Sequence, residues 1–262
     1  MNKQAPLLLL LLLCISLYSC KDKAAKTVSQ ETDNSKINAV NPETTSGEVF
    51  QTQKLYVIAP NGLSLRKENS LESEKLAGMP LGSEVLLLEG NNTADLEVEH
   101  IKGSMLKVGF DGQVGYAFSG YLSPIWLRSE NEDTKAHLLK LKETFPSISF
   151  ESKRTDPDFH EGNIDTFTLP ASTWHEAFYV VAGIYDLPKS FGFPNPSGPD
   201  KEILEEPNKP EEIWSSDLEV ERANNTLTKI TYGYRAEGFG YSVEITRPNT
   251  ADFRIEHLAF VD

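Results

Sequence analysis

The sequence predicts a mixed fold, in which a small all-β barrel is followed by an α+β domain with an antiparallel meander and two helices. The first observation is a series of short apolar segments, broken by Gly, Pro and Asn, between residues 54 and 125. The second is that two helical patterns and a group of strand patterns follow from residue 126 onward. A chain of 262 residues has room for two such domains.

The N-terminus has the features of a secretory signal. Lys3 precedes a run of leucines from Leu7 to Leu13, and the apolar stretch ends at Tyr18, short of the roughly 20 residues that a spanning helix needs. Residues 17–20, Leu-Tyr-Ser-Cys, resemble the lipobox of bacterial lipoproteins. The resemblance implies that residues 1–19 are a signal peptide and that Cys20 is lipidated, with fatty chains such as palmitate. An ordinary secretory signal with an incidental cysteine is the alternative.

Residues 20–53 are the lipidated cysteine and a polar tract that we expect to be a flexible tether. With Cys14 removed and Cys20 acylated, the mature chain has no thiol, which excludes disulfides, thiolate metal sites and cysteine catalysis. The net charge of −14 argues against nucleic acid as a partner, because phosphates require a basic surface. We expect the mature chain in the cell envelope, anchored by lipid outside the cytoplasm, with the outer membrane as its location. Lys21-Asp22 resembles a signal that sends some lipoproteins to the cell surface.

The barrel is expected over residues 54–125. Asp111-Gly112 lies between two alternating runs and is a strong hairpin signal, and Asn61-Gly62 marks an earlier turn. The expected strands lie at 55–58, 63–65, 84–88, 105–108 and 113–117.

The motifs of this segment resemble a bacterial SH3-like (SH3b) domain. The most specific part is the run Gly-Gln-Val-Gly-Tyr at 112–116, followed by Tyr-Leu at 121–122; the run Leu-Ser-Leu-Arg at 63–66 falls at the expected distance before it. In SH3b domains, bound peptides or wall fragments often lie against aromatic side chains, which give contact area at low entropic cost. The resemblance therefore implies a ligand-binding surface formed by Tyr56, Arg66, Tyr116 and Tyr121.

The segment departs from the SH3b pattern at positions that affect ligand binding. Lys67-Glu68 replaces the usual Gly-Pro or Ala-Pro, and Met105 and Tyr116 stand where tryptophan is usual. The segment from Gly90 to Gly103 is longer than the usual loop, and we expect it to cover or reshape the groove.

The α+β domain is expected over residues 126–262. Apolar residues share one face of a predicted helix over 134–145, which Pro146 ends. Strands at 147–152 and 164–169 predict a hairpin around a polar loop. Thr173 to Glu176 form a capping box that opens a second helix, apolar nearly all round, which predicts a central core helix.

The remaining sequence predicts a long connection and then the meander. Six prolines between Pro188 and Pro210 predict an irregular surface excursion. Four strands separated by turns follow, at 218–222, 227–235, 239–247 and 253–261. Four rings lie on neighbouring strands across one of these turns: Tyr232, Tyr234, Phe239 and Tyr241. Core packing is the favoured interpretation of these rings, and a ring-lined surface that grips sugar or peptide is the alternative.

No motif predicts a catalytic or metal centre, and we expect neither a metal nor a cofactor. The acidic segment 156–165 lacks two features of a calcium loop, because Glu161 and Phe167 replace the turn glycine and the final glutamate. The five histidines lack zinc spacing, and no Gly-x-Ser-x-Gly elbow occurs. A zinc site assembled from distant residues is the alternative.

We therefore expect a non-catalytic envelope lipoprotein that binds peptide or cell-wall material, such as peptidoglycan, through its SH3b-like domain. Two alternatives stay open. One is a cell-wall hydrolase that the SH3b-like domain directs to its substrate. The other is a protein-protein adaptor in which the barrel is structural.

Overall fold

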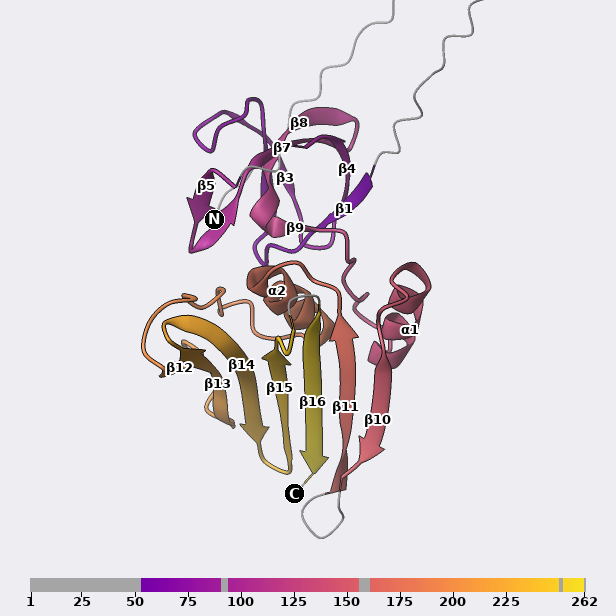
Figure 1. Ribbon diagram of the computed structural model, residues 1–262, viewed down its shortest axis with the longest axis vertical. Coiled ribbons are helices and arrows are strands. Elements are labelled where there is room, and N and C mark those ends of the chain that lie inside the picture. Colours follow the sequence, from indigo (N-terminus) through magenta and orange to yellow (C-terminus); the bar gives the residue numbers. More distant parts are fainter. Residues whose placement is uncertain (1–52, 91–93, 156–160, 250–251, 262) are drawn as a thin grey trace, which may run out of the picture. The chain divides into compact units, whose positions relative to one another are not determined.

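The computed structural model describes residues 53–90, 94–155, 161–249 and 252–261, which belong to one compact unit, Val49–Asp262. About half of these residues lie in strands, so this part of the chain is mostly β; it contains two antiparallel seven-stranded sheets, one two-stranded sheet and two α-helices (Figure 1). Within the described ranges, no helix has the length and apolar character to cross a membrane. The predicted signal peptide, Cys20 and the tether up to residue 52 lie outside the described residues, and Gln53, the last residue of the predicted tether, begins the first strand.

The N-terminal sheet contains every strand that was predicted for residues 54–125. Its order is β3-β2-β8-β7-β4-β1-β9, and the pairing leaves it open, so closure into a barrel is not seen. Alternate side chains, such as Leu55, Val57 and Val108, point into a small core. The strands are β1 (Gln53–Val57), β2 (Leu63–Arg66), β3 (Lys75–Met79), β4 (Glu84–Glu89), β7 (Met105–Phe110), β8 (Gln113–Phe118) and β9 (Leu122–Ser123).

Two tight turns shape this half of the chain. Asp111 and Gly112 have φ angles of 48° and 73°, and this left-handed pair forms the predicted turn between β7 and β8. The long segment before β7 contains an additional hairpin, β5 (Leu96–Val98) and β6 (Ile101–Gly103), which turns at Glu99 and His100. Glu99 and His100 have positive φ angles of 50° and 67°, so this turn is formed by a left-handed pair like that at Asp111-Gly112.

The C-terminal sheet confirms the antiparallel meander. Its order is β10-β11-β16-β15-β14-β13-β12. The predicted irregular connection is corrected at β12, which pairs with β13 through alternating residues and forms one edge of the sheet. The strands are β10 (Phe150–Arg154), β11 (Glu161–Leu169), β12 (Lys201–Glu205), β13 (Ile213–Ala223), β14 (Thr226–Ala236), β15 (Phe239–Thr246) and β16 (Phe253–Val261).

Both predicted helices are present, α1 (Thr134–Thr144) and α2 (Trp174–Ile184). The Thr173 hydroxyl accepts from the Glu176 amide, as a capping box requires. The reciprocal bond differs from the prediction, because the Glu176 carboxylate accepts from the Ser172 amide at 2.6 Å and from the Ser123 hydroxyl at 2.7 Å. The buried carboxylate therefore joins the start of α2 to β9, the edge strand of the N-terminal sheet.

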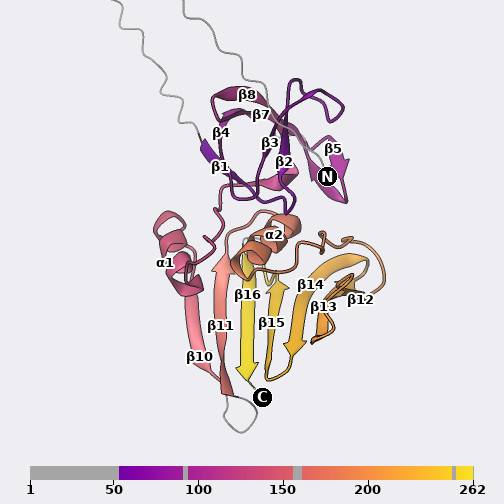
Figure 2. The same ribbon diagram turned by 180° about the vertical axis from the view of Figure 1, so that it is seen from behind.

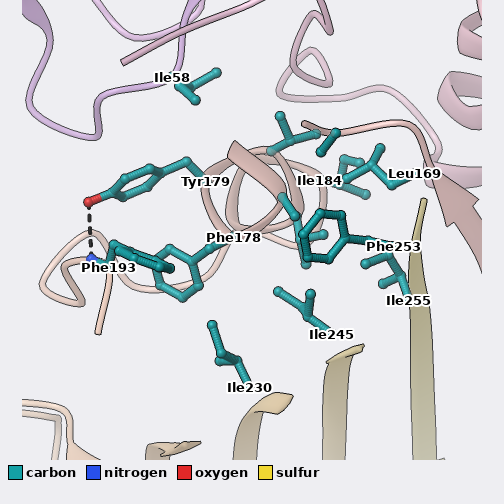
Figure 3. Close-up of a cluster of buried hydrophobic side chains, with 14 of the residues drawn as sticks. Ile58, Leu169, Phe178, Tyr179, Ile184, Phe193, Ile230, Ile245, Phe253 and Ile255 are labelled. Carbon is teal, nitrogen blue, oxygen red and sulfur yellow. Dashed lines mark hydrogen bonds between the residues drawn. The ribbon is translucent and has the colours of Figure 1, made fainter. Parts of the chain in front are cut away.

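The main core lies between α2 and one face of the C-terminal sheet. Figure 3 shows Phe178 and Ile184 of α2 above Ile230, Ile245 and Ile255 of the strands. Residues of the N-terminal half, among them Ile58 and Phe118, are buried in the same cluster. The two sheets thus share apolar contacts, which links their stabilities.

Candidate functional site

The structure brings only two of the four residues of the predicted SH3b-like surface together. Arg66 and Tyr116 are direct cross-strand partners on β2 and β8. The Arg66 guanidinium donates to the Ser73 carbonyl at 2.6 Å. Tyr56 lies on β1, where its ring is 6.2 Å from that of Trp126. The rings at positions 56 and 116 therefore have different surroundings.

Tyr121 is engaged in contacts within the protein. Its hydroxyl donates to the Glu99 carboxylate at 2.8 Å, and its ring lies 5.6 Å from that of Tyr179 on α2. Burial, followed by the hydrogen bond to Glu99, raises the pKa of Tyr121. The hairpin of β5 and β6 thus supplies the carboxylate that binds this tyrosine, as expected of a loop that covers part of the predicted surface.

A more convergent set of side chains lies on the C-terminal sheet, beyond the end of α2. Figure 1 shows α2 across one end of this sheet, while the strands continue past it, and Figure 2 shows the same arrangement from behind. Side chains two residues apart share a face of a strand. The face that is apolar beneath α2 therefore continues into Tyr241, Phe239 and Asp165 farther along the strands.

Five rings form a continuous series on this face. Tyr234 and Tyr241 are stacked cross-strand partners with centroids 5.2 Å apart. Phe239 lies 5.9 Å from Tyr241 on one side, and His257 lies 5.8 Å from it on the other. His257 in turn stacks on Tyr185, the residue that caps the C-terminus of α2, at 4.5 Å.

A cavity of about 380 Å³ opens along this series. That volume is within the range of small-ligand sites, roughly 300 to 1,000 Å³. The cavity lies where the end of α2, the start of α1 and the strands β11, β15 and β16 meet. Its lining consists of Arg128, Thr134, Asp165, Ile184, Tyr185, Asp186, Phe239, Tyr241, His257 and Ala259.

Arg128 holds the end of α2 at the rim of the cavity. Its Nε donates to the Ile184 carbonyl at 2.8 Å, one Nη donates to the Glu132 carbonyl at 2.7 Å, and the other pairs with the Asp186 carboxylate. A cation at a helix C-terminus also interacts favourably with the helix dipole. Arg128 is therefore committed to the scaffold, and its charge is balanced locally.

Tyr185 contributes a polar atom that the protein does not satisfy. Its hydroxyl is buried and has no hydrogen-bond partner among the described residues. Burial, with a smaller effect of the Asp165 charge, raises the pKa of Tyr185, so the phenol is protonated at neutral pH. A buried hydroxyl without a partner is energetically costly, roughly 1 to 3 kcal/mol, and such a group calls for an explanation.

Asp165 and His257 are direct cross-strand partners in the same cavity. Burial lowers the pKa of His257, and the opposing effect of the Asp165 charge is smaller, so the imidazole is neutral at pH 7. A neutral imidazole offers one donor and one acceptor, while a carboxylate offers acceptors only. Together with the Tyr185 phenol, the cavity presents both kinds of hydrogen-bonding group beside aromatic rings.

A larger cavity of about 770 Å³ lies beside α2, at Ile58, Leu81 and Phe191. Two of its charged lining residues, Arg128 and Asp186, neutralise each other in the ion pair already described. The larger cavity contains neither the ring series nor the unsatisfied phenol. The smaller cavity is therefore the better candidate. The described residues contain no group of three or more His, Asp or Glu side chains placed to hold a metal ion.

Sequence reasoning identified part of this site. The sequence pattern of Tyr232, Tyr234, Phe239 and Tyr241 favours core packing, with a binding surface as the alternative. In the structure Tyr232 is buried in the core, while Phe239 is 42% exposed and lines the cavity with Tyr241. Asp165, Tyr185 and His257 were not proposed as site residues, because they come from three distant segments and show no local motif. The rejected calcium loop falls partly at residues 156–160, outside the described residues.

Comparisons with known proteins leave the family open. No family model matches the chain, and no solved structure matches it. The chain is 29% identical over 72 residues to the teichoic acids export ATP-binding protein TagH of Bacillus cereus. The match covers 28% of this chain and 12% of that protein, so this chain spans only a small part of the length of its relative.

Proposed function

We propose that this chain is a non-catalytic envelope lipoprotein, anchored through a lipidated Cys20, that binds peptide or cell-wall material. The observation that carries the binding function is the ring-lined cavity at the end of α2, where an unsatisfied phenol, a carboxylate and a neutral imidazole meet. Rings provide contact area, and the polar groups provide orientation, as in small-ligand sites generally. These groups are suited to stacking and hydrogen bonding.

The proposal includes an SH3-like role for the N-terminal sheet. The strand order and the Asp111-Gly112 hairpin are compatible with such a domain, and Arg66 and Tyr116 lie side by side on it. In this proposal Tyr56 and Tyr121 contribute less to ligand contact, because both rings pack against residues outside the sheet. The N-terminal sheet then supplements the cavity as a second contact surface.

Binding is tested with the full chain in detergent and purified peptidoglycan sacculi. We expect the protein to sediment with the sacculi, whereas an acidic control protein of similar charge stays in the supernatant. Phe239→Ala should reduce sedimentation, and Trp214→Ala, which removes another exposed ring outside the cavity, should leave it unchanged. Failure of the unaltered protein to sediment above the control would refute the binding function.

The anchor is tested separately by mass spectrometry of the protein isolated from membranes. We expect a mature N-terminus at Cys20 carrying acyl chains, since two or more chains are needed for stable anchoring. A mature N-terminus without acyl groups, or an intact leader, would contradict the lipoprotein assignment and would leave the binding result unaffected.

A further inference from the structure

We propose that the cavity at the end of α2 binds a neutral saccharide unit, with the sugar ring against Phe239 and Tyr241 and its hydroxyls toward Asp165, His257 and Tyr185. This inference rests on the proposed binding function and narrows its ligand from peptide or cell-wall material to a glycan. It adds three residues, Asp165, Tyr185 and His257, that come from separate strands and from the end of α2.

The shape of the site fits a single sugar ring with its neighbours in a chain. The volume of about 380 Å³ is at the small end of the range for ligand sites. Phe239, at the start of β15, is 42% exposed, and its ring lies 5.9 Å from that of the less exposed Tyr241, so one ring is available to a ligand from solvent. Aromatic rings offer apolar surface to the C–H groups of a sugar without ordering a flexible side chain.

The hydrogen-bonding groups favour a polyhydroxylated ligand over an amine. The buried Tyr185 hydroxyl needs an acceptor for its proton, and an ammonium group has donors only. A sugar hydroxyl both donates and accepts, so it satisfies the phenol and the neutral His257 imidazole at once. Asp165 has no cationic partner among the described residues, and its two oxygens are free to accept from neighbouring hydroxyls.

The charges of the lining disfavour an anionic ligand. Among the described residues of the lining, Arg128 is the one cationic side chain and already pairs with Asp186, which leaves the Asp165 carboxylate as the uncompensated charge. A phosphate or carboxylate in this cavity would therefore meet repulsion. A neutral sugar avoids this repulsion, and its affinity should change little with salt, because screening acts on charged partners.

The experiment is calorimetry of the full chain in detergent with three probes: neutral oligomers of N-acetylglucosamine, free peptidoglycan stem peptides, and tetralysine. We expect the oligosaccharide to bind with an affinity that is the same at low and high salt. Preferential binding of the stem peptide, or of tetralysine with strong salt dependence, would overturn the saccharide assignment.

Three variants assign the binding to this cavity. Tyr185→Phe should weaken oligosaccharide binding roughly 2- to 10-fold, the effect of one hydrogen bond, while leaving the thermal midpoint of the unliganded protein unchanged or higher, because it removes an unsatisfied group. Asp165→Asn should weaken binding roughly tenfold or more, since it removes a charged acceptor. Phe239→Ala tests the ring at the mouth, and Trp214→Ala is its control.

The outcomes separate this inference from the broader function. If the protein sediments with sacculi but does not bind the oligosaccharide, the saccharide assignment is wrong, while the envelope binding function still holds. If none of the three variants, Tyr185→Phe, Asp165→Asn and Phe239→Ala, alters oligosaccharide binding, the glycan binds elsewhere on the protein. Failure of both assays would remove the binding function itself.

Discussion

Single residues with several polar partners connect the elements of this protein. Arg128 is the clearest case, because its guanidinium contacts the end of α2, the turn before α1 and the Asp186 carboxylate. Its side chain is only 10% exposed, so its bonds to the Ile184 and Glu132 carbonyls are largely shielded from water, whereas the side chain of Asp186 is 76% exposed. Glu176 acts in the same way at the other end of α2, where its carboxylate accepts from Ser123 and Ser172.

Replacing Arg128 by Met should lower the free energy of unfolding by about 2 to 3 kcal/mol. The variant keeps most of the apolar stem but leaves the Ile184 and Glu132 carbonyls without their charged donor. Urea denaturation measures the difference. The control is Lys54→Met, which breaks the ion pair between Lys54 and Glu84. Their side chains are 60% and 44% exposed, so water screens the pair, and this substitution should have a far smaller effect on stability. Equal effects of the two substitutions would contradict the role given to Arg128.

At the level of elements, turn geometry positions the strands of both sheets. The Asn224-Asn225 pair has φ angles of 53° and 59°, and Asp111-Gly112 has the same left-handed pattern. Such turns match the right-handed twist of the strands that they join. The hairpins β13-β14 and β7-β8 thus follow directly from short sequence signals.

Gly112→Ala should destabilise the protein by about 1 kcal/mol. A Cβ at this position would meet no atom within 4 Å, so the cost comes from the positive φ of 73° and not from a clash. Gly109→Ala is the matched control on the preceding strand, where a Cβ would make ordinary contacts at 3.8 Å and beyond. Thermal denaturation compares the two, and a loss for Gly109→Ala as large as that for Gly112→Ala would argue against the turn geometry.

For the whole molecule, the shared core predicts that the two sheets unfold together. Trp174 and Trp214 lie in the C-terminal half, whereas the Trp126 ring lies 6.2 Å from that of Tyr56 on β1. In a Trp126→Phe background, tryptophan fluorescence therefore reports on the C-terminal half. Leu65→Ala removes a fully buried side chain of the N-terminal core, a change that typically costs about 2 to 5 kcal/mol. We expect this substitution to lower the urea midpoint seen by tryptophan fluorescence. An unchanged midpoint, with a separate earlier transition by circular dichroism, would show that residues 54–125 and 126–262 unfold independently.

Stability should also fall as the pH drops from about 6.5 toward 4. Burial lowers the pKa of His175 to about 4, and it also lowers the pKa values of His137 and His257. The unfolded chain has histidine pKa values of about 6.5, so between these limits it binds more protons than the folded chain. The stability that the neutral, buried histidines contribute is fully present above about pH 6.5 and is lost progressively as the pH falls toward 4.

Urea denaturation across this range measures the slope, and His175→Gln should make it shallower. A slope that the substitution leaves unaltered would assign the acid sensitivity to other groups. Because three histidines contribute, one substitution removes only part of the effect.

The local features of the fold could be predicted because they depend on neighbouring residues. Hydrophobic alternation, the turn pairs and the Thr173 cap identified the predicted strands and both helices. The β12 strand was missed because the prolines around it suggested an irregular segment, while its pairing with β13 depends on residues that lie later in the chain. Local sequence patterns could not predict that the N-terminal sheet is open, because closure depends on whether its edge strands, β3 and β9, pair with each other.

By itself, the sequence determined the acidic charge, the leader pattern at the N-terminus, the periodicity of each element and the presence of clustered rings on the meander. Only the tertiary structure decided which rings are buried and which line a cavity, and it alone brought Asp165, His257 and Tyr185 together. The physical reason is that strand register and the end of a helix place side chains by contacts between segments far apart in the chain, and no window of neighbouring residues contains those contacts.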